Sequence, residues 1–323
     1  VGRIEPYFMG PLSFEEYLAA TGETNAMQTI QMLDVHTMNQ VPESVHGDLM
    51  SLVRRYTLTG GMPGCIQLAR DTQHDHGEIL KHQTVLIQTY KDDFAKYSGT
   101  ANAAKLSVFF TGIVRQVGLQ FSHKLAREIS SLSSGDNRQL NAAIELFLQA
   151  RLFHRVLHSN AERIPLGAET KTRISKFLFL DIGLLLAAQG LSPQAIMQAP
   201  IELANQGVLA EQFVGQQLLY GKKGHVEPEL YYWQPPKSET QAEVDFLFPF
   251  ENHIYPVEVK SGQGGTIKSL LSYVVKKKAD QAVVISSAMP SVEQLTAKVN
   301  KAQRPFRLLR IPFYLVNRLE RLL

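Results

Sequence analysis

The sequence predicts a multidomain protein of α and α/β class, with a helical region at residues 1–100, a compact unit of helices and a strand pair at 101–191, and an α/β sandwich at 192–323. Three observations lead to this prediction. Apolar residues recur at helical spacing through much of the first hundred residues, three further helical patterns precede two short strands, and strands alternate with helices in the last third. The 323 residues suffice for two or three domains of ordinary size.

The composition is typical of a globular protein. Hydrophobic residues make up 44% and charged residues 20% of the chain. The single cysteine, Cys65, excludes an internal disulfide and agrees with a reducing compartment. The most apolar run, residues 177–188, is interrupted by Asp181 and too short to span a bilayer, and no secretory signal opens the chain. We therefore expect a cytoplasmic protein without membrane contact.

The net charge of +3 is unevenly distributed. Residues 1–201 are balanced, with 18 Lys/Arg and 18 Asp/Glu, whereas residues 202–323 carry 15 and 12. This is a mild indication of a polyanionic partner for the last third of the chain, weaker than in a dedicated nucleic-acid binder.

The first hundred residues predict a short strand at 1–9 followed by helices. Ser13 and Glu16 have the spacing of a capping box at a helix start. Further helices are expected at 46–56 and from about residue 78. A polar segment between them contains three histidines whose spacing favours a solvated segment over a metal cluster, namely His74, His76 and His82.

The middle unit has the element order of a winged helix. Helices are expected at 105–117, 122–131 and 138–150, and strands at 153–158 and 176–180. The second helix offers Lys124 and Arg127 for contacts with DNA. Winged helices also serve as protein-interaction domains, so both interpretations stay open.

The last third begins with a polar, proline-containing connector at 192–206, the predicted domain boundary. A helix expected from about residue 203 carries Glu211 within an apolar face, where a buried acid needs a partner. A strand at 230–233 follows, then two strands within the segments 242–248 and 255–262.

These two strands carry charges at alternating positions: Glu243 and Asp245 on the first, Glu258 and Lys260 on the second. An acid on one strand beside an acid-x-lysine pair on its neighbour suits a divalent-metal and phosphate site, in which the carboxylates hold the ion and the lysine ammonium orients a water or offsets negative charge. An edge hairpin with a solvated face is the alternative.

The remaining elements are a helix at 267–278, strands at 282–286 and 306–315, and a final helix at 318–323. Four lysines of the first helix are candidates for phosphate contacts: Lys268, Lys276, Lys277 and Lys278. The loop before this helix is not a P-loop, because Ile267 stands where backbone approach to phosphate requires glycine. We expect no ATP site in this chain.

The segment from Glu211 to Lys260 resembles the PD-(D/E)XK nuclease superfamily. In this resemblance Glu211 matches the helix acid, Asp245 the second-strand acid, and Glu258 and Lys260 the third-strand pair. The resemblance implies a nuclease-like α/β sandwich with four catalytic residues in place.

A wider resemblance covers nearly the whole chain. It is similar to the prokaryotic AAA-type ATPase family with a C-terminal domain of unknown function, on the following segments: 11–17, 60–63, 90–94, 179–185, 211–214, 231–233 and the strand pair. In that family a P-loop ATPase precedes a helical lid, a winged helix and the nuclease-like domain. Walker segments are lacking here, which implies a C-terminal part, with residues 1–100 as a lid remnant continuing from a missing ATPase core.

Three functions are open. The first is a Mg²⁺- or Mn²⁺-dependent nuclease acting on DNA, in which Asp245 and Glu258 hold the metal and Lys260 positions the attacking water. The second is a non-catalytic DNA-binding module that couples an ATPase to DNA. The third is a protein-interaction or homo-oligomerisation module, with the chain's own N-terminal ATPase domain among its partners.

Overall fold

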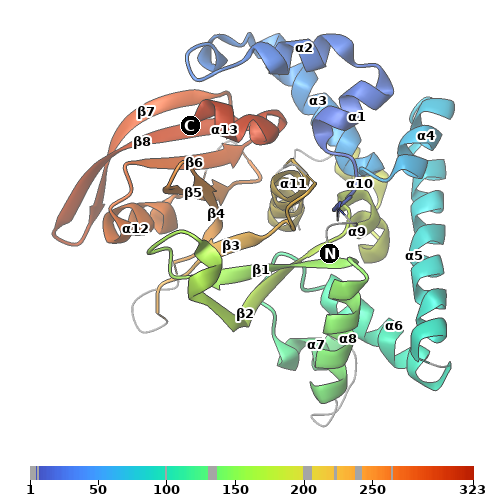
Figure 1. Ribbon diagram of the computed structural model, residues 1–323. Coiled ribbons are helices and arrows are strands. Elements are labelled where there is room, and N and C mark those ends of the chain that lie inside the picture. Colours follow the sequence, from blue (N-terminus) through green and yellow to red (C-terminus); the bar gives the residue numbers. More distant parts are fainter. Residues whose placement is uncertain are drawn as a thin grey trace.

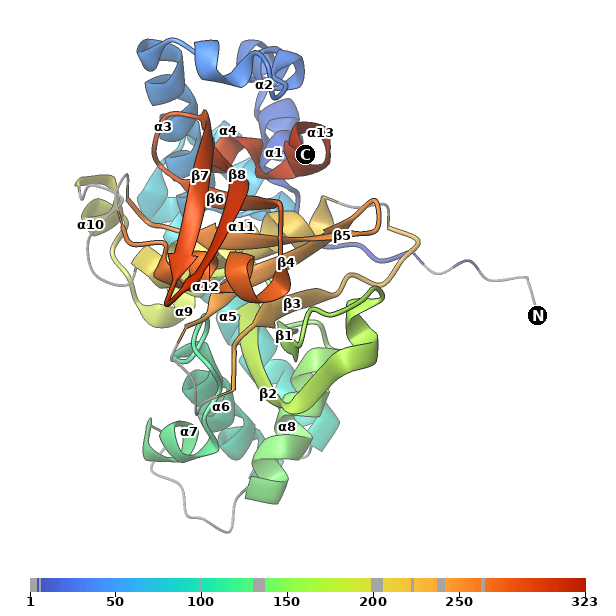
Figure 2. The same ribbon diagram turned by 90° about the vertical axis from the view of Figure 1, so that its left-hand side faces the viewer.

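The computed structural model describes residues 5, 7–98, 100–129, 137–198, 206–221, 224–236, 242–262 and 265–323. Within these ranges, eight strands form one mixed sheet in the order β2-β1-β3-β4-β5-β6-β8-β7. In both views the sheet lies between one group of helices, α1 to α4, and a second group, α6 to α8 (Figures 1 and 2).

The N-terminal region is helical, as predicted. Its elements are α1 (Phe14–Thr21), α2 (Thr24–Met32), η1 (Met38–Gln40), α3 (Glu43–Thr59), α4 (Pro63–Asp71) and α5 (His76–Ser98). The predicted capping box is present: Ser13 N donates to Glu16 Oε2 at 2.7 Å, and Glu16 N donates to Ser13 Oγ at 3.4 Å. The strand expected at 1–9 lies partly outside the described residues, and residues 7–9 form no strand.

The middle of the chain has the predicted order of three helices and two strands. These are α6 (Thr100–Val114), α7 (His123–Ile129), α8 (Asn137–Gln149), β1 (Phe153–Ser159) and β2 (Thr170–Phe179), with η3 (Leu166–Glu169) before β2; α9 (Ile182–Gln189) and α10 (Pro193–Gln198) follow. The hairpin β1–β2 is antiparallel, and β1 also pairs in parallel with β3. One sheet therefore joins strands from both sides of the boundary predicted at 192–206, of which residues 199–205 lie outside the described residues.

The last third supplies most of the sheet. Its elements are α11 (Gln206–Tyr220), β3 (Leu230–Trp233), β4 (Val244–Phe250), β5 (His253–Val259), α12 (Lys268–Lys277), β6 (Gln281–Ser286), β7 (Ser291–Val299), β8 (Ala302–Pro312), η4 (Phe313–Arg318) and α13 (Leu319–Leu322). The sequence interpretation missed β7. Most of its side chains are half-buried or exposed, so the strand depends on its pairing with β8 and not on an apolar pattern.

The two faces of the sheet are covered by different helices. Phe246, Val257 and Val283 belong to a core shared with α11, whereas Leu247 and Val284 pack with residues of α12. This alternation is the period-two pattern of strands buried on both faces. The C-terminal strands thus form the predicted sandwich, with α11 on one face and α12 on the other.

Three buried glutamines of α11 join this helix to its neighbours. Gln212 bonds both the N–H and the carbonyl of Phe179, Gln216 accepts from Ile182 N at 2.9 Å, and Gln217 accepts from Phe14 N at 2.7 Å. Because buried amides are costly without partners, these bonds hold α11 in a defined position between sheet and helices. Because these bonds fix α11, they also fix the position of Glu211, which lies on the same helix.

Candidate functional site

The structure brings together the four residues that the strand pattern and the family resemblance singled out. On β4 and β5, Phe246 pairs with Val257, so the next positions, Asp245 and Glu258, face one another on neighbouring strands. Lys260 follows the end of β5, and its Nζ lies 2.6 Å from Glu258 Oε1. Glu211 reaches the same place from α11 and is linked to Asp245 and Glu243 through a shared lysine.

That lysine, Lys176 on β2, was missed by the sequence interpretation. Its side chain is 4% exposed, and its Nζ lies 3.2 Å from Glu211 Oε2 and 3.9 Å from Asp245 Oδ1, with a direct ion pair to Glu243 Oε1. The only signal in the sequence is a lysine directly before the apolar run Phe177–Phe179. Its partners lie far along the chain, so local spacing could not reveal them.

The carboxylate oxygens at the site are not equally engaged. Asp245 Oδ2 accepts from Val259 N at 2.7 Å, and Glu258 Oε1 is held by Lys260. Among the described residues, Asp245 Oδ1 has only the 3.9 Å contact with Lys176 Nζ. Glu258 Oε2 is buried and has no hydrogen-bond partner among the described residues. A buried, unpartnered carboxylate oxygen is costly and therefore indicates a place for a ligand.

The pKa values of the acids at the site are shifted because several carboxyl groups lie close together and are buried from water. Burial, and next to it Asp245, raise the pKa of Glu211 to about 8 and that of Glu258 to about 7. Burial also raises the pKa of Asp245. Burial by itself lowers the pKa of a lysine, but Glu211, Asp245 and Glu243 hold the pKa of Lys176 above its ordinary value. Lys176 is therefore a permanent cation.

The donor set fits a magnesium-type ion held by few protein ligands. Mg²⁺ is commonly bound by one or two carboxylates, with water and substrate phosphate completing its shell. Asp245 Oδ1 and Glu258 Oε2 are two such oxygens. The described residues contain no group of three or more His, Cys, Asp or Glu side chains that could hold a metal ion, so an all-protein cage is absent from this part of the chain, at His74, His76 and His82 as well.

The lysines predicted to contact DNA are separated by the fold. Lys268 begins α12, and Ser269 beside it accepts the N–H of Glu243 through its hydroxyl at 3.2 Å, which places this helix end at the site. Lys276, Lys277 and Lys278 lie at the other end of α12, where Lys277 Nζ is 3.6 Å from Glu162 Oε1. The structure thus brings one of the four lysines to the site.

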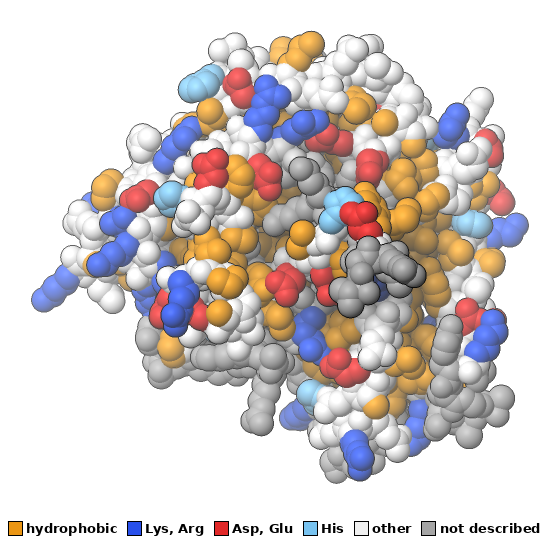
Figure 3. All heavy atoms as spheres, viewed as in Figure 1, with side chains coloured by type: hydrophobic (Ala, Val, Ile, Leu, Met, Phe, Trp, Pro, Cys, Tyr) orange, Lys and Arg blue, Asp and Glu red, His pale blue; other side chains and the backbone are white. Residues whose placement is uncertain are grey.

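The predicted DNA contacts on the middle unit lie elsewhere. Lys124 on α7 pairs with Glu128 at 3.8 Å, and the side chain of Arg127 lies outside the described residues. In both ribbon views α7 lies with α6 and α8 below the sheet (Figures 1 and 2). Acidic and basic side chains are interspersed over the face shown in Figure 3.

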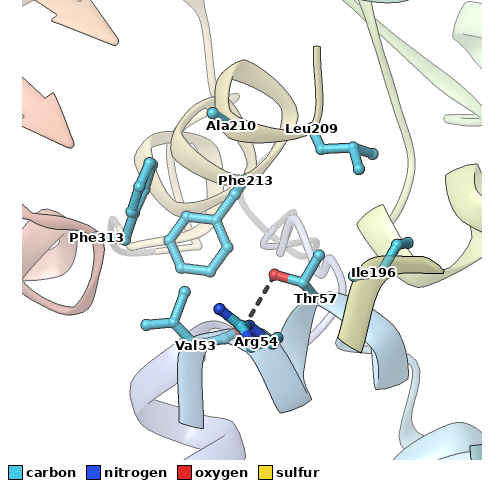
Figure 4. Close-up of a pocket in the computed structure, with 8 residues that line it drawn as sticks. All are labelled: Val53, Arg54, Thr57, Ile196, Leu209, Ala210, Phe213 and Phe313. Carbon is cyan, nitrogen blue, oxygen red and sulfur yellow. Dashed lines mark hydrogen bonds between the residues drawn. The ribbon is translucent and has the colours of Figure 1, made fainter. Parts of the chain in front are cut away.

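A hollow on the α11 side is separate from this site. Its walls come from α3, α10, α11 and η4, with Phe213 and Phe313 directed into it (Figure 4). Arg54 lies at its side and donates from Nη1 to Met197 O at 3.2 Å, which ties α10 to α3. The lining is mainly apolar and includes none of the predicted site residues.

Comparisons with known protein families match two separate segments of the chain, which meet near the boundary predicted at residues 192–206. Residues 50–195 match a domain of unknown function, DUF8612, which includes Lys176. Residues 206–300 match another, DUF4143, a domain often found at the C-terminus of AAA ATPases, which includes Glu211, Asp245, Glu258 and Lys260. No curated protein and no solved structure matches the chain. None of the described helices combines the length and apolar character needed to cross a membrane. The site therefore combines acids from the residues that match DUF4143 with a lysine from the residues that match DUF8612.

Proposed function

We propose that this chain is the C-terminal part of an AAA-type ATPase and that the site on α11, β4 and β5 hydrolyses phosphodiester bonds of DNA with the help of a divalent cation. The observation that carries the proposal is Glu258 Oε2, which is buried opposite Asp245 and beside Lys260 and has no hydrogen-bond partner in the described part of the chain. These are the residues that the PD-(D/E)XK resemblance assigns to catalysis.

Asp245 and Glu258 would hold Mg²⁺ or Mn²⁺. Such an ion, when bound, acidifies a coordinated water and offsets charge on the phosphate. The chain's own groups prepare for this. The Val259 N–H orients Asp245, and the Lys260 ammonium orients Glu258. With a side chain 26% exposed, Lys260 can also meet a phosphate oxygen or a water from solvent.

DNA would approach where α12 begins, so that Lys268 adds a phosphate contact near the site. The winged-helix-like unit, through Lys124 and Arg127, and the lysines at the end of α12 would contribute more distant contacts. Such contacts release counterions, so DNA affinity should fall steeply with salt.

The test is a cleavage assay on linear, branched and supercoiled DNA with Mg²⁺ or Mn²⁺. We expect cutting that Glu258→Gln and Lys260→Met each reduce by about 100-fold or more, since a positioned catalytic group contributes that much. Glu293→Gln is the matched control, because Glu293 is also ion-paired, with Arg310 at 2.7 Å, but lies on β7. Absence of cleavage of all three substrates, or full cleavage by Lys260→Met, would overturn the proposal.

A second candidate is a non-catalytic DNA-binding module that keeps the nuclease-like fold as a scaffold. The ion pairs of Lys176 with the acids favour it, because they neutralise part of the site without a metal. This alternative predicts salt-dependent DNA binding that Lys260→Ala leaves unchanged, without cleavage.

A further inference from the structure

Lys176 is a buried lysine whose ammonium lies among three carboxylates. Its ammonium is surrounded by Glu211, Glu243 and Asp245, which come from α11, from the residue before β4, and from β4. A cluster of carboxylates attracts a cation, which a metal ion supplies in carboxylate metal sites. Here that cation is part of the chain.

The fold keeps this cation in place. Lys176 pairs with Val156 in the β1–β2 ladder, and its Nζ lies 5.5 Å from the centre of the Tyr232 ring. The ammonium thus has ion-pair partners and an aromatic face, while the backbone is fixed within the sheet. A lysine held in this way cannot leave the acids without large cost.

We propose that Lys176 supplies the second cation of the site, so that the chain binds one divalent ion, between Asp245 and Glu258, where two-metal nucleases bind two. This inference rests on the proposed function and specifies its metal content. It divides the acids into two groups: Glu211 and Glu243 hold Lys176, and Asp245 and Glu258 each retain an oxygen for the ion. Glu211 is then a positioning residue and not a metal ligand.

The charges at the site agree with a single ion. Four carboxylates, from Glu211, Glu243, Asp245 and Glu258, carry −4 when ionised, and Lys176 and Lys260 contribute +2. One divalent ion brings the sum to zero. A second would leave +2 uncompensated in a mostly buried place, which is strongly unfavourable.

The experiment counts bound Mn²⁺ by electron paramagnetic resonance in the full chain. Wild type should bind one ion in this site, and Lys176→Met should bind two, because the acids then lack their internal cation. Lys260→Met is the matched control: it removes the lysine that pairs with Glu258, but Lys176 still occupies the place among the other acids, so this variant should still bind one ion.

Lys176→Met is expected to be less stable, so folding is checked by circular dichroism, and Lys176→Gln, which keeps a polar side chain among the acids, serves as a second variant. Lys176→Gln also removes the ammonium and leaves all four carboxylates in place, so it should bind two ions as well. Two ions in wild type, or a single ion in both folded Lys176 variants, would overturn the inference while leaving the proposed function intact. No ion in wild type would overturn the inference as well, whereas failure of DNA cleavage with one ion bound would overturn the proposed function alone.

Discussion

Two buried acidic sites in this molecule differ in the kind of group that stabilises their carboxylates. Asp181, at the start of α9, is fully buried and accepts hydrogen bonds from Gly61 N at 2.6 Å, Leu184 N at 3.0 Å and Gln216 Nε2 at 3.2 Å. All these donors are uncharged. The acids around Lys176 and Lys260 form ion pairs with these ammonium groups. Glu258 Oε2 has no hydrogen-bond partner among the described residues.

The difference separates an acid that only joins structural elements from the acids that we propose hold a divalent cation. Asp181 joins the turn after α3, the first turn of α9 and α11, and it needs nothing more. Gly60, at φ 73°, would place a Cβ 2.1 Å from Asp181 Oδ1, so the turn requires glycine there. Complete hydrogen bonding fixes structure, whereas incomplete bonding in a dry pocket preserves a place for a ligand.

The largest expected effect on stability is at Lys176. Lys176→Met should lower the free energy of unfolding by about 3–5 kcal/mol at neutral pH, because removing one partner of a buried ion pair leaves uncompensated charge. Urea unfolding measures this. Lys96→Met is the control, since the Lys96–Asp93 pair is solvent-exposed and should contribute less than about 0.5 kcal/mol. Equal small losses in both variants would contradict the role of Lys176.

A second pair of variants tests the comparison directly. Asp181→Ala should cost about 2–4 kcal/mol, because three buried donors lose their acceptor, while Mn²⁺ binding persists in whatever fraction is folded. Asp245→Ala should cost less stability, since it also relieves repulsion with Glu211 and Glu258, but should abolish Mn²⁺ binding. Thermal melting with and without Mn²⁺ checks both. Two results would contradict this distinction between the two acids. One is a rise in Tm with Mn²⁺ in Asp245→Ala, and the other is the absence of such a rise in folded Asp181→Ala.

The smallest effect concerns pH. At pH values well below 4.5, the ordinary pKa of a glutamate, Glu211 is protonated in both the folded and the unfolded chain. Its ionisation therefore does not affect the free energy of unfolding at those pH values. As pH rises toward its folded pKa of about 8, the unfolded chain releases the proton and the folded chain retains it, so wild type loses stability. Glu211→Gln should therefore be more stable than wild type by roughly 1–2 kcal/mol at about pH 8, and by less at about pH 5.

Unfolding in denaturant at the two pH values measures this difference. Glu128→Gln is the control, because Glu128 is exposed on α7 and pairs with Lys124 at 3.8 Å, and its effect should stay within a few tenths of a kcal/mol. A stability gain for Glu211→Gln that is larger at pH 5 would show that the carboxylate is not held protonated by burial.

Much of the site could be predicted from the sequence because its signals are local. The capping box of α1 and the alternation of acids on β4 and β5 depend on spacings of two to four residues, and such patterns determine helix starts and strand faces. The element order of the middle unit and the sandwich follow in the same way. Their names as winged helix and nuclease remain interpretations of that order.

What only the tertiary structure decided is how distant strands meet. The parallel pairing of β1 with β3 adds the hairpin β1–β2 to the C-terminal sheet, and this brings Lys176 to acids 35 and more residues along the chain. β7 likewise exists through its ladder with β8. Backbone pairing between remote segments leaves no periodic trace in sequence, because it is selected by the whole packed sheet. The sequence by itself determined the acids and their spacing, and the fold determined the lysine that lies among them.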